Sequence, residues 1–125
     1  MTVLIVDDEP EIRQFLRWDF EDEGFLILEA ESGHHALEVL SENPDIDAVL
    51  SDTKMPQGDG LSLIQNLKDE NIQTPVILMS GHFELSNAEL KKRGAFATVD
   101  KPICDSHALF QLVRKACQIQ KRVAI

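Results

Sequence analysis

Three aspartates follow strongly apolar stretches of the sequence. Asp7 and Asp8 come directly after residues 2–6, and Asp52 closes the run that starts at Ala48. Such runs are typical of strands that are buried on both faces of a parallel sheet. Ligands of open α/β sheets bind just outside the carboxyl ends of the strands, so all three carboxylates stand where a site is expected. The alternative is that each aspartate only caps the turn or helix that follows it.

Carboxylates gathered at one edge of a sheet favour a particular chemistry. They repel one another, so their pKa values rise unless a cation neutralises them. Mg²⁺ suits this setting because it prefers oxygen ligands and needs only one or two protein carboxylates. A carboxylate can also accept a phosphoryl group as an acyl phosphate. The sequence therefore indicates a magnesium site, with Asp52 as the candidate acceptor of phosphorus.

Two more polar residues stand at the ends of later apolar runs. Ser80 closes residues 76–80, and Lys101 comes just past the last short run, which ends at Val99. A lysine offers a compact positive charge for phosphate oxygens, and phosphoryl transfer needs little beyond positioning and charge compensation. Taken alone, Lys101 could equally be a solvated surface lysine.

Hydrophobic periodicity predicts the elements that must position these groups. Apolar runs alternate with amphipathic stretches five times, which is a repeated strand and helix pattern. Strands are expected at residues 2–6, 25–30, 48–50 with Asp52 at the carboxyl end, 76–80 and 95–99. Helices are expected from Pro10 to the stop at Gly24, from Ser32-Gly33 to Asn43-Pro44, across 61–67, across 84–93 as the weakest, and from about Asp105. The apolar anchors expected in the first helix are Ile12, Phe15, Leu16 and Phe20, and those in the last are Leu109, Leu112, Val113, Ala116 and Ile119.

The order of these elements predicts the fold class. Short connections with helices between strands require parallel pairing and right-handed crossovers, so we expect an α/β, doubly wound, five-stranded parallel sheet. The chain has 125 residues, and no linker or repeat divides it. Residues 1–125 are therefore expected to form one domain.

Composition excludes several classes of function. The chain carries 12 basic and 22 acidic residues and a net charge of −10, which disfavours direct binding to DNA or RNA. No apolar run approaches the roughly 20 residues that a membrane span needs. No basic segment precedes the first strand, as it would in a secretory signal, so a cytoplasmic location is expected.

Five sequence elements together resemble the receiver domain of two-component response regulators. They are Asp7-Asp8, Asp52 with the following Met55-Pro56 and Asp59-Gly60, Ser80, and Lys101-Pro102. Their order and spacing span the whole chain, which makes the resemblance far more specific than any single motif. It implies a flavodoxin-like fold with strand order 2-1-3-4-5 and flanking helices. It also implies a phosphoacceptor switch rather than an enzyme with turnover.

The resemblance assigns roles to the site residues. Asp52 would be the phosphoacceptor. Asp8 and Asp52 would bind Mg²⁺ directly with the backbone carbonyl of Lys54, and Asp7 would help, often through water. Ser80 would hydrogen-bond the phosphoryl group and Lys101 would pair with it.

The resemblance also implies partners. A sensor histidine kinase or a histidine phosphotransfer protein would donate the phosphoryl group. A downstream target, or a second copy in a homodimer, would dock on the face formed by the fourth helix, fifth strand and last helix. The peptide bond between Lys101 and Pro102 is a candidate for the cis form, which is common only before proline.

Three positions depart from the usual receiver pattern or vary within it. Thr98 stands where the family commonly has Tyr or Phe, whose inward rotation reports phosphorylation, so we expect a muted aromatic switch. Phe96 is the candidate for a partial substitute. Lys54 and His82 lie two residues after Asp52 and Ser80, positions that influence how long the acyl phosphate survives.

Two rival classes are weighed against this assignment. A phosphatase of the haloacid dehalogenase type also uses a strand-end aspartate with magnesium, but it needs a second acid two residues later, where this chain has Lys54. A nucleotide-binding or flavin-binding module would need a glycine-rich phosphate loop after a strand, and the glycines of this chain do not form one.

Overall fold

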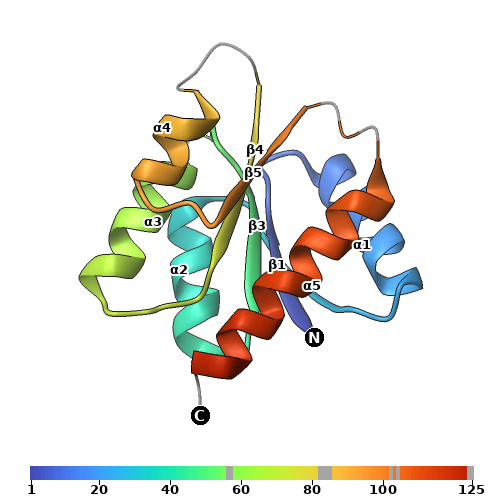
Figure 1. The fold of residues 1–125 in the computed structure, drawn as a ribbon, viewed down its shortest axis with the longest axis horizontal. Helices are drawn as coiled ribbons and strands as arrows, with labels where there is room; N and C mark the ends of the chain where they lie inside the picture. The colour runs from blue at the N-terminus through green and yellow to red at the C-terminus, as the bar shows by residue number, and fades with distance from the viewer. Residues whose placement is uncertain (56–57, 82–85, 102, 104, 124–125) are drawn as a thin grey trace.

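The computed structural model describes residues 1–55, 58–81, 86–101, 103 and 105–123, with side chains up to residue 119. Its sheet has five parallel strands in the order β2-β1-β3-β4-β5, as the sequence predicted. The strands are β1 (Thr2–Val6), β2 (Leu26–Ala30), β3 (Ala48–Asp52), β4 (Val76–Ser80) and β5 (Ala97–Asp100). Figure 1 shows this sheet edge-on between two layers of helices.

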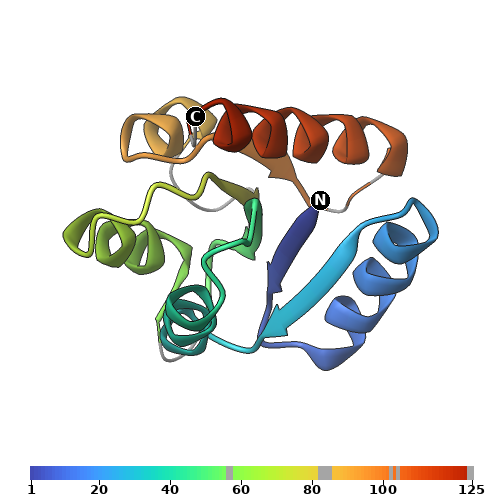
Figure 2. The same cartoon turned by 90° about the horizontal axis from the view of Figure 1, so that it is seen from below.

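Five helices cover the two faces of the sheet. They are α1 (Pro10–Asp22), α2 (Gly33–Glu42), α3 (Gly60–Asp69), α4 (Asn87–Lys92) and α5 (Ser106–Val123). Helices α1 and α5 lie on one face, and α2, α3 and α4 lie on the other (Figures 1 and 2). The fold class is therefore the doubly wound α/β arrangement that the alternation of strands and helices requires.

Strands β1 to β4 each supply side chains to two separate cores. In β1, Val3 and Ile5 join the cluster under α1 and α5, whereas Leu4 and Val6 join the cluster under α2, α3 and α4. All four side chains are fully buried. This is why the strand appears in the sequence as an unbroken apolar run rather than as an alternation.

Two helices begin with side-chain caps next to the site. The Ser32 hydroxyl oxygen accepts a hydrogen bond from the backbone N–H of His35 at 3.1 Å, at the start of α2. The Asp59 carboxylate accepts one from the backbone N–H of Ser62 at 2.8 Å, at the start of α3. Such caps satisfy N–H groups that have no partner within the helix, and each is worth about 1 kcal/mol.

The predicted packing of α1 is wrong at one position. Leu16 and Phe20 are buried, as expected, but the side chain of Phe15 is 62% exposed. Each residue turns a helix by about 100°, so Phe15 lies to one side of the row formed by Leu16 and Phe20, which faces the sheet. Ile119, expected as the last apolar anchor of α5, is likewise exposed, at 38%.

Two predicted strand boundaries shift because a helix end takes the first residues. Phe25 was expected in the second strand, but its N–H bonds the carbonyl of Phe20 and closes α1. In the same way the N–H of Ala95 bonds the carbonyl of Leu90, after Gly94 adopts a φ of 119°. This is the usual glycine termination of a helix, and it delays β5 to Ala97.

Several sequence predictions lie outside the described residues. They concern His82, the first part of the predicted helix over 84–93, and the peptide bond to Pro102. Within the described part of the chain, none of the helices combines the length and the hydropathy that crossing a bilayer would require.

Candidate functional site

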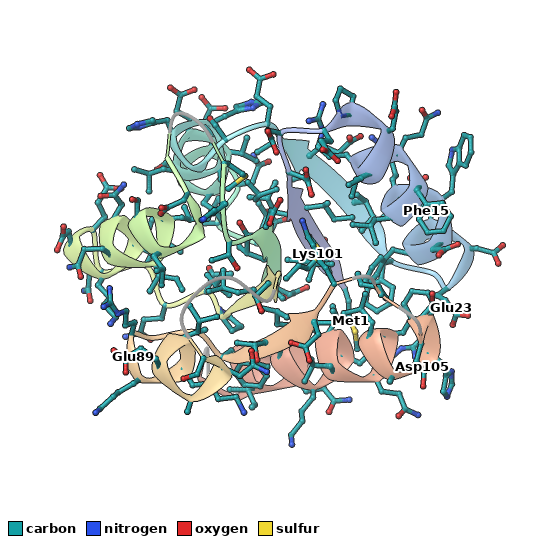
Figure 3. The ribbon with its side chains drawn as sticks, turned by 90° about the horizontal axis from the view of Figure 1, so that it is seen from above. Met1, Phe15, Glu23, Glu89, Lys101 and Asp105 are labelled. Carbon is teal, nitrogen blue, oxygen red and sulfur yellow. The ribbon has the colours of Figure 1, made fainter. Side chains whose placement is uncertain are left out.

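The parallel register brings the carboxyl ends of four strands to one edge. Val6 pairs with Ser51, so the next residues, Asp7 and Asp52, leave neighbouring strands side by side. Figure 3 looks onto this edge, with Lys101 above the ends of the central strands. The sequence therefore places these side chains together through strand order alone, as expected for an open α/β sheet.

Asp7, Asp8 and Asp52 form a compact acidic cluster. One carboxylate oxygen from each lies within 4.8 Å of the others. Asp7 is fully buried, Asp52 is partly buried and Asp8 is exposed. The cluster is thus open to solvent on one side and closed by protein on the other, a geometry that suits a cation that keeps some of its water.

Lys101 reaches the cluster from beyond β5. Its ammonium Nζ lies 2.8 Å from Oδ2 of Asp52, and the two side chains are 32% and 13% exposed. The backbone N–H of Lys101 donates to the carbonyl of Ser80 at 2.9 Å, which ties the start of this loop to the end of β4. Asp52 therefore has the positive charge of Lys101 at contact distance.

The carboxyl group of Asp7 is incompletely paired. Its Oδ1 accepts a hydrogen bond from the backbone N–H of Glu9 at 2.9 Å. Its Oδ2 is the one buried side-chain N or O atom that lacks a hydrogen-bond partner among the residues described. Burial raises the pKa of Asp7 from 3.8 to about 6, and the charges of Asp52 and Asp8 add to this effect. The sequence predicts a raised pKa from repulsion between the carboxylates, whereas in the structure the burial of Asp7 is the larger cause.

The loop after Asp52 is anchored at both ends. The hydroxyl and the backbone N–H of Thr53 both donate to the carbonyl of Met79, at 2.9 and 3.1 Å. Further along, the carbonyl of Gly58 accepts the N–H of Gly33 at 2.8 Å, at the start of α2. The loop that follows the candidate acceptor is thereby tied to β4 through Thr53 and to α2 through Gly58.

Gly60 closes this loop where space is tightest. A Cβ at this position would lie 2.6 Å from Cδ2 of Leu78 and 2.7 Å from the backbone oxygen of Asp52. We expect Gly60→Ala to lower the free energy of unfolding by about 1–3 kcal/mol, because the backbone next to Asp52 must shift. Urea denaturation measures this, with Gly81→Ala as the control, since a Cβ at Gly81 meets nothing within 4 Å. Equal effects of the two substitutions would contradict the packing argument.

The donor set fits a hard divalent cation. Among the described residues it consists of carboxylates only, and one of these, Asp7, also has a buried oxygen without a hydrogen-bond partner. An unpartnered buried oxygen is costly unless something binds it. Mg²⁺ matches such a set better than zinc, which favours histidine and cysteine.

The other residues singled out in the sequence lie at different distances from the acidic cluster. Ser80 is buried at the end of β4, and Lys54 is exposed in the loop after Asp52. Thr98 is half-buried within β5, beside a hollow lined by residues of α5. The N–H of Phe96 bonds the carbonyl of Val76 at the first residue of β4, so Phe96 lies at the opposite end of the sheet from the site. This position argues against Phe96 as a partial substitute for the aromatic switch.

Sequence reasoning missed one side chain that touches the acidic turn. Nη1 of Arg13 donates to the backbone carbonyl of Asp7 at 2.6 Å. An arginine on a predicted amphipathic helix carries no sequence signal of such a contact, because it depends on how the helix docks on the sheet.

The comparison with known families agrees with the observed fold. Residues 3–114 match the family model described as response regulator receiver domain. Regulatory protein AtoC of Escherichia coli K12 is 38% identical over 120 residues, which cover 94% of this chain and 25% of AtoC. A putative NtrX-like response regulator of Rickettsia felis is 37% identical over 125 residues, covering 97% of this chain and 26% of that protein. The chain thus spans about a quarter of the length of these relatives.

Solved structures of receiver domains have the same fold. A response regulator receiver domain protein from Clostridium thermocellum superposes with a TM-score of 0.89 at 32% identity, and 98% of each chain is covered. The receiver domain of NtrX from Brucella abortus superposes with a TM-score of 0.83 at 27% identity, covering 93% of this chain and 98% of that one.

Proposed function

The chain belongs to the response regulator receiver domain family, and from that premise we propose that it is a signalling switch phosphorylated on Asp52. One observation carries the proposal. Asp52 lies within 4.8 Å of two other carboxylates and 2.8 Å from the ammonium group of Lys101. An acceptor carboxylate, a cation site and a positive charge for phosphate oxygens thus meet at one strand edge.

The acidic cluster would hold Mg²⁺. Asp8, Asp52 and the backbone carbonyl of Lys54 would be its direct ligands, with Asp7 binding it directly or through water. When bound, the ion offsets the negative charge of an incoming phosphoryl group. This assignment is supported by the unpartnered oxygen of Asp7 and by the raised pKa of that carboxyl group.

The side chains of this chain would carry the transfer. A carboxylate oxygen of Asp52 attacks the phosphorus of a phosphohistidine on a partner protein, the P–N bond breaks, and the imidazole leaves with the electron pair. Lys101 exchanges its contact with the Asp52 carboxylate for one with the phosphoryl oxygens, and the Ser80 hydroxyl donates a hydrogen bond to them. Only contacts that differ between the two states can shift the conformation.

A phosphatase of the haloacid dehalogenase type is the alternative, and turnover separates the two. We expect acetyl phosphate with Mg²⁺ to label the protein up to one phosphoryl group per chain, with phosphate released only as fast as the label decays. Sustained release of phosphate from several phosphomonoesters would favour the phosphatase. Lys54 stands where that class needs its second acid, which supports the receiver assignment.

The partners follow from the same proposal. A sensor histidine kinase or histidine phosphotransfer protein would supply phosphohistidine, and a downstream target or a second copy would bind the face made by α4, β5 and α5. Helix α4 has six residues, the shortest of the five helices described. A short helix with little buried surface is easily repositioned, which fits an output face.

Two exposed aromatic residues mark a surface for the phosphodonor. Phe15 and Trp18 are 62% and 64% exposed and lie three residues apart on α1, so they share one side of that helix. Helix α1 begins two residues after Asp8. Large exposed aromatic side chains are typical of protein interfaces, and tryptophan is enriched among the residues that dominate binding.

We expect Trp18→Ala to slow phosphotransfer from the partner protein by at least tenfold, about 1.4 kcal/mol, while labelling by acetyl phosphate stays unchanged. Parallel time courses with the two donors measure this. Leu26→Ala is the matched control, because Leu26 is 68% exposed at the start of β2, far along the strand from the site. Equal slowing with both donors would assign Trp18 to folding instead.

A further inference from the structure

Arg13 connects the acidic turn to the edge of the sheet. Its Nη1 donates to the backbone carbonyl of Asp7 at 2.6 Å, and its Nε donates to Oε1 of Glu29 at 3.1 Å. Its side chain is 15% exposed and that of Glu29 is 28% exposed. A guanidinium group has donors in a fixed planar fork, so it can serve both acceptors at once.

The two bonds fix the residue that follows β1. The N–H of Asp7 donates to the carbonyl of Ala30 at 3.1 Å, at the end of β2. The carbonyl of Asp7 accepts from Arg13, which is anchored one residue earlier on the same strand, at Glu29. Both peptide groups of Asp7 are therefore tied to β2, one directly and one through the guanidinium group.

Anchoring of the Asp7 backbone is important because the side chain of Asp7 has few hydrogen bonds of its own. Its carboxyl group accepts one backbone hydrogen bond, from Glu9, and its Oδ2 has no partner among the described residues. The direction in which Oδ2 points therefore depends on the backbone of Asp7. We propose that Arg13 is a positioning residue, which holds the turn so that the carboxylates of Asp7 and Asp8 face the cation site. The proposal rests on the proposed function of that site.

Arg17 provides the comparison that separates positioning from simple stabilisation. It lies one turn further along α1, and its Nη1 bonds Oε2 of the same Glu29 at 2.7 Å. Its Nε bonds Glu21 at 3.3 Å, so its hydrogen bonds run to side chains away from the acidic turn. Arg13 and Arg17 thus share a helix, a charge and a partner, but the bond to the backbone of Asp7 belongs to Arg13.

The test measures binding of Mg²⁺ alone by isothermal titration calorimetry, on wild type, Arg13→Met, Arg13→Lys and Arg17→Met. We expect Arg13→Met to weaken Mg²⁺ binding by about tenfold, the lower end of what loss of an outer-shell partner costs. Arg17→Met should bind as wild type does. Arg13→Lys should recover only part of the affinity, because an ammonium group does not reproduce the fork. Thermal unfolding without metal shows whether the two methionine variants lose similar stability.

Equal Mg²⁺ affinities of Arg13→Met and Arg17→Met would reduce Arg13 to a structural ion pair and overturn the proposal. If Arg13→Met does not fold, Glu29→Met removes the acceptor that anchors Arg13 and should still weaken Mg²⁺ binding relative to Arg17→Met. A wild-type protein that neither binds Mg²⁺ nor takes up a phosphoryl group would instead overturn the proposed function.

Discussion

Replacing Asp52 with asparagine is expected to abolish phosphorylation. The carboxylate of Asp52 is the group that lies beside both the acidic cluster and Lys101, and an amide is too weak a nucleophile to form the acyl phosphate. We expect labelling by acetyl phosphate to fall by at least about a thousandfold, as for loss of other catalytic nucleophiles. Intact-protein mass spectrometry over time measures the uptake of one phosphoryl group.

Asp59→Asn is the matched control for that substitution. Asp59 lies in the loop that follows Asp52 and caps α3 through the N–H of Ser62, and asparagine caps a helix as well as aspartate does. Its labelling should match that of wild type. A phosphoryl group that still appears on Asp52→Asn at the wild-type rate would place the acceptor elsewhere.

Replacing Asp7 with asparagine is expected to raise the stability of the metal-free protein. It is also expected to reduce the stabilisation that Mg²⁺ provides. Burial raises the pKa of Asp7 to about 6 from 3.8, so the folded state holds this proton over a range of pH in which the unfolded chain has released it. Stability conferred by the protonated form is therefore lost as the pH rises from about 4 to 6. Above pH 6 the wild type carries a buried charge at a cost of up to about 3 kcal/mol.

Asparagine removes that charge and keeps an oxygen for the N–H of Glu9. Urea denaturation in EDTA should show Asp7→Asn gaining up to about 3 kcal/mol over wild type above pH 6, and little or nothing near pH 4. A ligand that binds only the folded state raises its stability. Adding Mg²⁺ should therefore stabilise the wild type by more than the variant, which lacks the charge of Asp7 at the cation site. A variant less stable than wild type at both pH values in EDTA would show that Asp7 is a structural residue instead.

The parallel fold class and the gathering of the acidic residues could be predicted from the alternation of strands and helices, and the strand order was implied by the resemblance to receiver domains. Residues 3–6 and 48–50 are unbroken apolar runs, each with an aspartate within the next two residues, and parallel strands present their carboxyl ends together. The boundaries of β1 and β4 coincide with the predicted ones, since a polar or turn-forming residue limits each run. A register of this kind needs no knowledge of side-chain packing.

The features that sequence could not supply depend on how the elements dock. Phe15 has the spacing of a core residue, but it is exposed once α1 is docked on the sheet. The bond from Arg13 to the carbonyl of Asp7 likewise depends on how α1 docks. The main cause of the raised pKa of Asp7, its burial, is likewise a property of the packed edge and not of the acidic pair in the sequence.

A crystal structure of the protein with Mg²⁺ and beryllium trifluoride, which mimics a phosphoryl group, would test the central claim most directly. The account predicts one cation coordinated by Asp8, Asp52 and the carbonyl of Lys54 with Asp7 beside it. It also predicts beryllium bonded to a carboxylate oxygen of Asp52, with Lys101 and Ser80 contacting the fluorides. A cation bound elsewhere, or beryllium attached to a different side chain, would contradict it.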